Sequence, residues 1–115
     1  MKRLKVKLSD YTVYMYDVNS SNIASVGYDG ENELLYIEFL DGSIYRYENV
    51  GPDLWQMLKI VNSKGSWLHW NIVINEDAYP YDDVTGDVDI QNVGSITQIG
   101  GMPGEPHENG YMTGF

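Results

Sequence analysis

The chain of 115 residues contains no cysteine. This absence excludes disulfides, thiolate zinc sites and cysteine nucleophiles, and it is typical of the cytosol, so we expect a cytoplasmic protein. Long hydrophobic runs are also missing. No stretch approaches the length of a membrane span, and no apolar segment typical of a signal peptide follows the basic N-terminus. We therefore expect no membrane partner.

Positive charge is scarce and unevenly distributed. Lysine and arginine number 7 against 17 acidic residues, which gives a formal net charge of −10. The first positions hold Lys2, Arg3, Lys5 and Lys7. A negative field repels nucleic acid and anionic membranes and attracts a basic partner, although it also serves solubility alone.

Aromatic side chains are plentiful, and most of them carry a polar group. The chain has 10 tyrosines and 3 tryptophans but only 2 phenylalanines. Rings with a hydroxyl or an indole N–H suit half-buried sheet faces and contact surfaces. The composition therefore favours a protein with a binding surface.

Alternation of apolar and polar residues at 4–8, together with runs of β-branched and aromatic residues and turn residues between them, predicts a small antiparallel sheet. The predicted strands cover residues 4–8, 12–18, 23–28, 34–40 and 43–47. Both faces of residues 34–40 are largely apolar, which predicts a central strand that is either covered on both sides or covered on one side and used for contact on the other. Asp41-Gly42 favours a hairpin turn in which both central residues have a positive φ.

One helix is predicted after this sheet. Pro52 and Asp53 suit its first turn, and apolar residues recur at helical spacing as far as Val61. Gly65 fits a left-handed cap at its end, with Lys64 complementing the helix dipole. A further strand or extended segment is expected at residues 67–74. The expected fold class is thus α+β, a small antiparallel β-sheet packed against one helix.

We divide the chain into three parts: an N-terminal strand pair (1–18), a central domain (19–74) and an acidic, glycine-rich extension (75–115). The extension contains a β-like stretch at residues 93–99, a linker-like run at 100–106 and an apolar tip at 111–115. The apolar two-faced strand, the N-terminal strands and the apolar tip favour exchange between copies, so we expect a homo-oligomer.

Six short segments resemble the KTSC family in their order along the chain. They are Ser20 to Ile23, Gly27 to Asp29, Leu35 to Phe39, Gly42 to Tyr47, Val50 to Pro52 and Ser63 to Trp67. The family is named for an association with the C-terminus of lysyl-tRNA synthetases, and free-standing members occur in phages and prophages. The resemblance implies strands followed by a helix and a further strand. It also implies a binding role, with nucleic acid as the suggested ligand.

Two groups of residues are expected to bind a ligand. The segment Ser63-Lys64-Gly65-Ser66 offers two hydroxyls, an ammonium and a glycine backbone for an anion, and Ser63, Lys64 and Gly65 are the expected ligand contacts. Ser20 and Ser21 would strengthen this site if they fold beside it. The alternative is a plain helix cap.

The second group combines cationic and aromatic side chains. Arg46 can stack on a base or hold a phosphate, although it can also pair with a cross-strand carboxylate such as Glu38. The rings expected to stack on a base are Tyr28, Tyr45 and Trp67.

No catalytic residue, metal site or cofactor is expected. His69 and His107 lack the context of an acid–base or metal site, and His69 is expected to be structural. The acidic residues between Asp82 and Asp89 lack the spacing of an EF-hand, so a solvated loop is expected there.

The expected function is that of a non-enzymatic binding protein, a phage or prophage accessory protein in the host cytoplasm. Its ligand would be a nucleotide-like small molecule or nucleic acid, which includes sequestration of a host signalling nucleotide. The alternative is an acidic protein that binds and inhibits a basic host protein, such as a nucleic-acid-binding factor.

Overall fold

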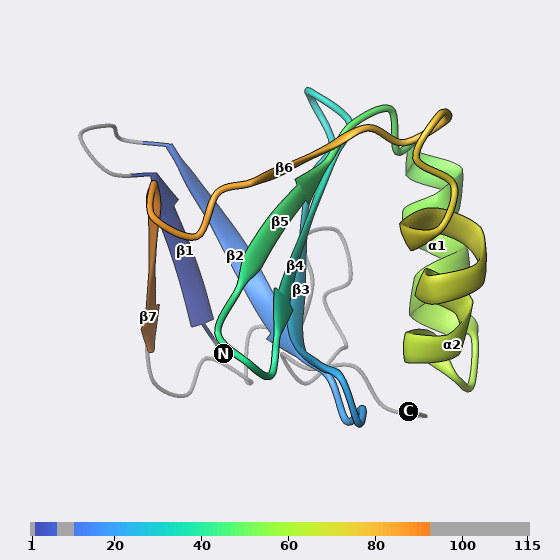
Figure 1. Cartoon of the computed structure of the whole chain (residues 1–115), viewed down its shortest axis with the longest axis horizontal. Coiled ribbons are helices and arrows are strands. Elements are labelled where there is room, and N and C mark those ends of the chain that lie inside the picture. Colours follow the sequence, from blue (N-terminus) through green and yellow to red (C-terminus); the bar gives the residue numbers. More distant parts are fainter. Residues whose placement is uncertain (1, 7–10, 93–115) are drawn as a thin grey trace.

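A curled antiparallel sheet with helices on one face forms the fold (Figure 1). The computed structural model describes residues 2–6 and 11–92. Seven strands follow in the order β6-β5-β4-β3-β2-β1-β7, and every neighbouring pair is antiparallel. They are β1 (Lys2–Val6), β2 (Thr12–Asp17), β3 (Ile23–Asp29), β4 (Leu34–Phe39), β5 (Ile44–Tyr47), β6 (Tyr81–Asp83) and β7 (Val88–Asn92). The predicted α+β class is confirmed.

The first helix, α1 (Pro52–Ile60), follows the sequence prediction closely. Pro52 occupies the start of the helix, Asp53 lies in its first turn and Lys59 in its last turn, where each charge complements the helix dipole. Trp55 and Leu58 are buried against the sheet. The apolar stripe therefore attaches α1 to the sheet.

The strand predicted at residues 67–74 is wrong, because this region is helical. It forms α2 (Lys64–Leu68) and a π-helix, η1 (His69–Val73). Lys64, Leu68 and Ile72 are all buried and recur every four residues, which is the spacing of a helical stripe. Aromatic and β-branched residues suggest a strand by propensity, but burial of this stripe outweighs that preference.

The end of α1 also differs from the prediction. The helix stops at Ile60, followed by the extended residue Val61 with φ −73° and ψ 147°. Gly65 lies inside α2, and among the described glycines only Gly42 has a positive φ. Gly65 is therefore not a left-handed cap, and the structure has two α-helices and a π-helix where one helix was predicted.

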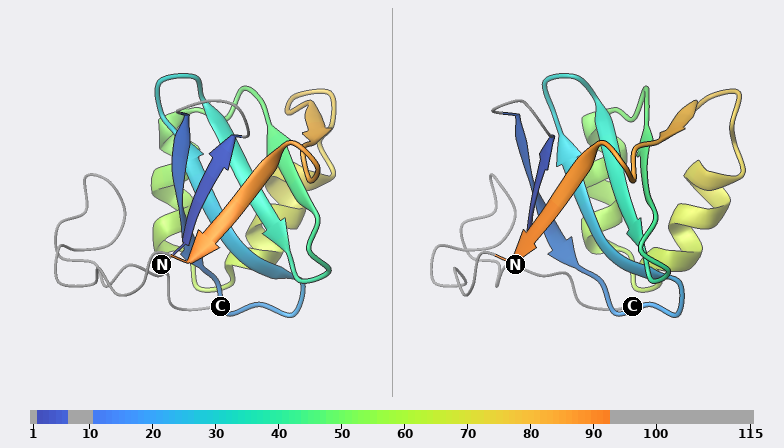
Figure 2. Two further views of the ribbon diagram at one scale, coloured as in Figure 1. Left: turned by 90° about the vertical axis from the view of Figure 1, so that its left-hand side faces the viewer. Right: turned by 60° about the vertical axis from the view of Figure 1, so that its left-hand side comes forward.

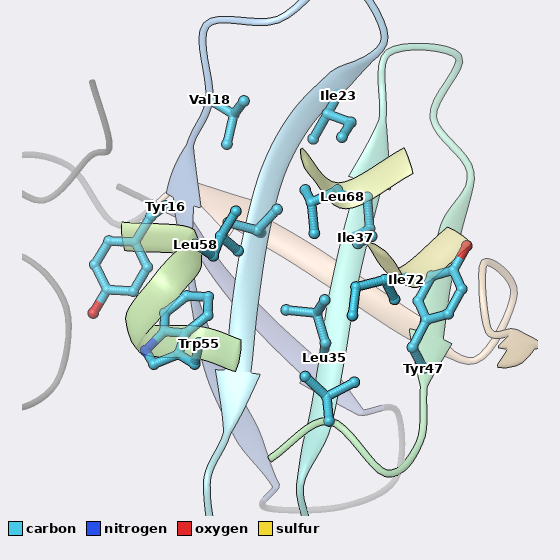
Figure 3. Packing of buried hydrophobic residues seen from close by; sticks show 12 residues of the cluster. Tyr16, Val18, Ile23, Leu35, Ile37, Tyr47, Trp55, Leu58, Leu68 and Ile72 are labelled. Carbon is cyan, nitrogen blue, oxygen red and sulfur yellow. The ribbon is translucent and has the colours of Figure 1, made fainter. Parts of the chain in front are cut away.

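One hydrophobic core lies between the sheet and the helices, and we call it the helix-side core (Figure 3). Its buried residues are Tyr16, Val18, Ile23, Val26, Leu35, Ile37, Tyr47, Val50, Trp55, Leu58, Leu68 and Ile72. Figure 3 shows Leu68 and Ile72 pointing from their helices toward Ile37 of β4. This contact explains why α2 and η1 stay on the same face as α1.

A second cluster, the far-side core, lies on the opposite face of the sheet. Its buried residues are Leu4, Val13, Met15, Tyr36, Ile44, Val84 and Val88. The segment after β6 runs from one edge of the sheet to the other. At one edge the Val84 N–H donates to the Ile44 carbonyl at 2.9 Å, and at the other edge β7 pairs with β1. In the left view of Figure 2 the helices lie behind the sheet and β7 crosses in front of it.

The strand covered on both faces is confirmed in β4. Leu35 and Ile37 are buried in the helix-side core, whereas Tyr36 is buried in the far-side core. The hairpin between β4 and β5 also forms. Only Gly42 has a positive φ there (92°), so the turn does not use positive φ at both central residues. The Phe39 N–H instead donates to the Ser43 carbonyl at 2.8 Å, as in a three-residue loop with a bulge.

The segments that flank the central region contribute to the same sheet. The predicted N-terminal pair forms as β1 and β2. The acidic stretch expected to be a solvated loop contains β6, which pairs with β5, and β7, which pairs with β1. The predicted β-like stretch at residues 93–99, the linker-like run and the apolar tip lie outside the described residues. Within residues 2–6 and 11–92, the helices are too short for a helical membrane crossing.

Candidate functional site

An open pocket lies between the loop that precedes β3 and the helical segments α2 and η1. We call it the serine pocket. Its volume is about 590 Å³, which is within the range of small-molecule sites. The lining residues are Asn19, Ser20, Ser21, Asn22, Ser63, Gly65, Ser66, His69 and Trp70. The structure therefore places Ser20 and Ser21 close to the segment from Ser63 to Ser66, as the predicted anion site required.

The contact between Ser20 and Gly65 determines how closely the loop before β3 approaches α2, and these two segments are two walls of the pocket. The Ser20 Oγ accepts hydrogen bonds from the N–H groups of Asn22 at 3.2 Å and Ile23 at 3.3 Å, which orders the entry into β3. A Cβ atom on residue 65 would lie only 2.8 Å from this Oγ. Glycine inside a helix costs about 1 kcal/mol relative to alanine. Close packing of the loop on α2 is the physical reason for glycine here.

The third wall is the π-helix η1. Its widened turn is marked by the Ile74 N–H, which donates to the His69 carbonyl at 3.2 Å, five residues earlier. Such turns are rare and occur frequently at functional sites. Trp70 is 67% exposed, and its ring packs edge-on against His69 with 5.0 Å between centroids. The turn therefore presents a large aromatic ring at the pocket.

The lining chemistry is polar and almost uncharged. Within the described part of the chain, the hydroxyls of Ser21, Ser63 and Ser66 have no hydrogen-bond partner in the protein. Each hydroxyl can donate one hydrogen bond and accept others. The lining contains no lysine, arginine, aspartate or glutamate, and its one ionisable side chain is that of His69. The pocket can thus bind by hydrogen bonds and ring stacking.

Lys64 does not line the pocket. Its side chain is only 2% exposed, and its ammonium donates to the Val61 carbonyl at 2.7 Å, just beyond the end of α1. A lysine near a helix C-terminus stabilises carbonyls that have no partner in the helix. This contact matches the helix-end alternative for the Ser63 to Ser66 segment, although the neighbouring serines belong to the pocket.

Two of the predicted stacking rings take part in packing. The Tyr28 ring stacks on Trp55 with 5.2 Å between centroids, and its hydroxyl donates to the Val50 carbonyl at 2.6 Å. Trp67 is half-buried against the helix-side core. Neither residue is part of the pocket lining.

Arg46 and Tyr45 lie on β5, beside the edge strand β6. The Arg46 guanidinium forms an ion pair with Asp82 at 3.0 Å. Glu38, named as an example of a partner from the sequence, instead accepts a hydrogen bond from Ser25 at 2.7 Å. The Tyr45 ring stacks on Tyr81 with centroids 5.3 Å apart. The structure therefore divides the predicted binding residues: it brings only Ser20, Ser21, Ser63 and Gly65 together, with Ser66 of the predicted anion segment beside them.

Sequence reasoning missed four lining residues: Asn19, Asn22, His69 and Trp70. The two on η1 were missed because residues 67–74 were assigned to a strand. The helical spacing of Leu68 and Ile72 was the available signal, since both are buried while Trp70 between them is exposed. Asn19 and Asn22 carried no comparable signal.

The acidic stretch offers no metal centre in the described residues. No three His, Asp or Glu side chains of residues 2–6 and 11–92 form a group that could hold a metal ion. Asp83 accepts a hydrogen bond from the Thr85 hydroxyl and another from its N–H at 3.0 Å. These bonds lower the pKa of the Asp83 carboxyl and order the turn before β7.

Comparison with known proteins identifies the central region. A family model of the KTSC domain matches residues 19–75. An uncharacterized protein from Stutzerimonas stutzeri (strain A1501) is 41% identical over 64 residues, which are 56% of this chain and 87% of that protein. The crystal structure of a KTSC domain protein from Yersinia pestis has a TM-score of 0.55 and 27% identity, and the match covers 62% of this chain and 96% of that one.

The family match contains the whole serine pocket, because every lining residue falls between Asn19 and Trp70. It also contains β3, β4, β5 and the three helical segments, whereas β1, β2, β6 and β7 lie outside it. The pocket is thus built by the matched region, and the flanking strands cover the other face of its sheet. On this evidence residues 19–75 of the chain form a KTSC domain.

Proposed function

We propose that this protein is a non-enzymatic binding protein that captures a nucleotide-like small molecule in the serine pocket. The observation that carries the proposal is the exposed ring of Trp70 in one pocket with serine hydroxyls that have no hydrogen-bond partner among the described residues. Stacking of a base on an aromatic side chain contributes about 1–3 kcal/mol. Serine hydroxyls and asparagine amides can meanwhile bond to the sugar and to the base edges.

The charge distribution supports a small ligand over nucleic acid. Binding of a long polyanion rests on several lysine or arginine contacts to phosphates. The pocket lining has neither residue, and the net charge of the chain is −10. A small ligand needs only the local groups of the pocket.

The proposal includes no chemical turnover. The lining offers no carboxylate, and among the described residues His69 makes no hydrogen bond to a serine hydroxyl. A serine nucleophile normally requires such a base within hydrogen-bond reach. Turnover of any bound nucleotide by the purified chain would contradict this part of the proposal.

The test is a calorimetric titration of the full chain with a panel of nucleosides and nucleotides. Trp70→Ala is expected to weaken binding about 5- to 150-fold, which corresponds to the loss of about 1–3 kcal/mol of stacking. Tyr14→Ala is the matched control, because Tyr14 is also an exposed aromatic residue (43%) but lies on β2 outside the lining. Absence of binding at millimolar ligand, or equal affinity of the Trp70→Ala variant, would overturn the proposal.

A second candidate function is binding and inhibition of a basic host protein. It is supported by the exposed acidic residues of β6 and the following turn, Asp82, Asp83 and Asp87. Such association depends steeply on ionic strength. A host protein captured at low salt, released at high salt and unaffected by Trp70→Ala would favour this candidate over the pocket. A phage origin and a host signalling nucleotide as the ligand stay predictions.

A further inference from the structure

We infer that the serine pocket accepts the uncharged part of its ligand, a base with its sugar, and leaves phosphate groups outside. This inference rests on the proposed function and names the ligand class more narrowly. It changes the expected order of ligand affinities: a nucleoside should bind at least as tightly as the corresponding nucleotide.

The lysine and arginine side chains that the structure describes, those of Arg46, Lys59 and Lys64, lie outside the pocket lining. Lys64 is buried, with its ammonium on the Val61 carbonyl at 2.7 Å. Arg46 is paired with Asp82 at 3.0 Å. Lys59 lies in the last turn of α1. None of the three is a lining residue, so a phosphate entering the pocket would meet no lysine or arginine of the described residues.

Desolvation makes this arrangement unfavourable for an anion. A charged group loses hydration when it enters a pocket, and the loss is offset only by opposite charges or by several hydrogen bonds. The net charge of the chain, formally −10, adds long-range repulsion. A triphosphate therefore loses affinity on both counts relative to the same group without phosphates.

The same lining is suited to an uncharged polar group. Ser21, Ser63 and Ser66 can both donate and accept hydrogen bonds, as sugar hydroxyls do, and Asn19 and Asn22 offer amides that match the edges of a base. Trp70 supplies the ring for the flat face of the base. A site that bonds to hydroxyl groups discriminates strongly against analogues that lack them, because its own groups are then left unpaired.

The experiment compares adenosine, AMP and ATP, and the same series of guanosine, by calorimetry at low and high salt with the full chain. The expected result is that the nucleoside binds about tenfold more tightly than the triphosphate at low salt, with the difference narrowing as salt screens the repulsion. Tighter binding of the triphosphate than of the nucleoside would overturn the inference and leave the proposed function standing. Absence of binding by every compound would overturn both.

A substitution that adds a cation provides an independent arm. Ser21→Lys, at an exposed lining position, is expected to raise triphosphate affinity about tenfold while the affinity for the nucleoside stays within about twofold. Lys64→Met is the control, because it removes a cation outside the lining and should not change the ranking. A Lys64→Met variant that loses triphosphate binding selectively would contradict the inference, since it would show that the Lys64 ammonium reaches phosphate.

Discussion

Ser20 and Gly65 are in such close contact that a Cβ atom on residue 65 would lie 2.8 Å from the Ser20 Oγ. The hydroxyl is held in place, because it accepts hydrogen bonds from the N–H groups of Asn22 and Ile23. The contact joins the loop before β3 to α2, and these two segments form facing walls of the serine pocket. The geometry of the pocket therefore depends on this pair.

The substitution Gly65→Ala tests this dependence. Overpacking typically costs about 1–3 kcal/mol, whereas alanine gains about 1 kcal/mol in a helix, so the variant should be less stable by about 1 kcal/mol. In a Ser20→Ala background the clash is absent, since the next nearest Ser20 atom, its Cβ, is at 3.6 Å. Gly65→Ala should then be neutral or stabilising. Urea unfolding of the unmodified chain, the two single variants and the double variant measures the coupling energy. Purely additive effects on the free energy of unfolding would show that the two residues do not interact.

Lys64 is expected to act on stability and not on ligand binding. Lys64→Ala removes the hydrogen bond to the Val61 carbonyl and buried aliphatic contacts, so it should lower the free energy of unfolding by about 1–3 kcal/mol. Lys64→Met keeps most of the aliphatic contacts and should cost less. Thermal unfolding of both variants gives the comparison. Equal stability of all three proteins would contradict the structural role.

The far-side core should contribute to stability through residues outside the family match. Val84 and Val88 are buried against Tyr36 and Ile44. Val84→Ala and Val88→Ala are each expected to lower the free energy of unfolding by about 1–2 kcal/mol, from lost burial and the cavity left behind. Ile60→Ala is the control at a site that is 74% exposed. If the two valine variants unfold at the same urea concentration as the control, the flanking strands do not stabilise the sheet.

Asp29 predicts a dependence of stability on pH. Burial acts to raise the pKa of its carboxyl, but hydrogen bonds from Tyr11, from the Asn32 side chain and from the backbone N–H groups of Asn32 and Glu31 outweigh burial, so the pKa lies below its usual 3.8. A lowered pKa in the folded state stabilises the protein above the unfolded value. This stabilisation is lost as the pH falls through the folded pKa.

Tyr11→Phe should therefore destabilise the protein by about 1 kcal/mol at neutral pH, because it removes one of these bonds. The difference from the unmodified chain should shrink as the pH falls below the unfolded pKa of about 3.9 and through the lower folded pKa of Asp29. Urea unfolding across this pH range measures both effects. Tyr14→Phe is the control, since Tyr14 is an exposed tyrosine of β2. A deficit that stays constant down to acidic pH would exclude the Asp29 carboxylate as the cause.

Self-association stays a prediction, and the structure removes one of the features from which it was inferred. The two-faced strand β4 is covered on both sides within one chain, so it does not require a second copy. The apolar tip at residues 111–115 remains as the expected contact. Light scattering at micromolar concentration should give a mass above that of the monomer, 13.1 kDa, for the full chain. Residues 1–92 alone should give the mass of a single copy of that shorter chain. A monomeric full chain would refute the prediction.

The sequence predicted those elements whose cause is local. Alternation at residues 4–8, runs of β-branched and aromatic residues, and turn residues identified strands that overlap β1 to β5, and Pro52 with Asp53 marked the start of α1. Residues 64–73 were misassigned because Trp67, Trp70 and the β-branched residues favour a strand, whereas Leu68 and Ile72 bury a helical stripe. Propensity and packing disagreed there, and packing prevailed.

The candidate site was predictable only in part. Its serine segments are visible in the sequence because they carry the family resemblance, and the scarcity of positive charge follows from composition alone. Only the tertiary structure decided that Ser20 meets Gly65, that Trp70 is exposed, and that Lys64 and Arg46 bind to other groups of the protein. These outcomes depend on residues far apart in the chain. Local patterns specify which element forms, but the packing of those elements determines which side chains remain available to a ligand.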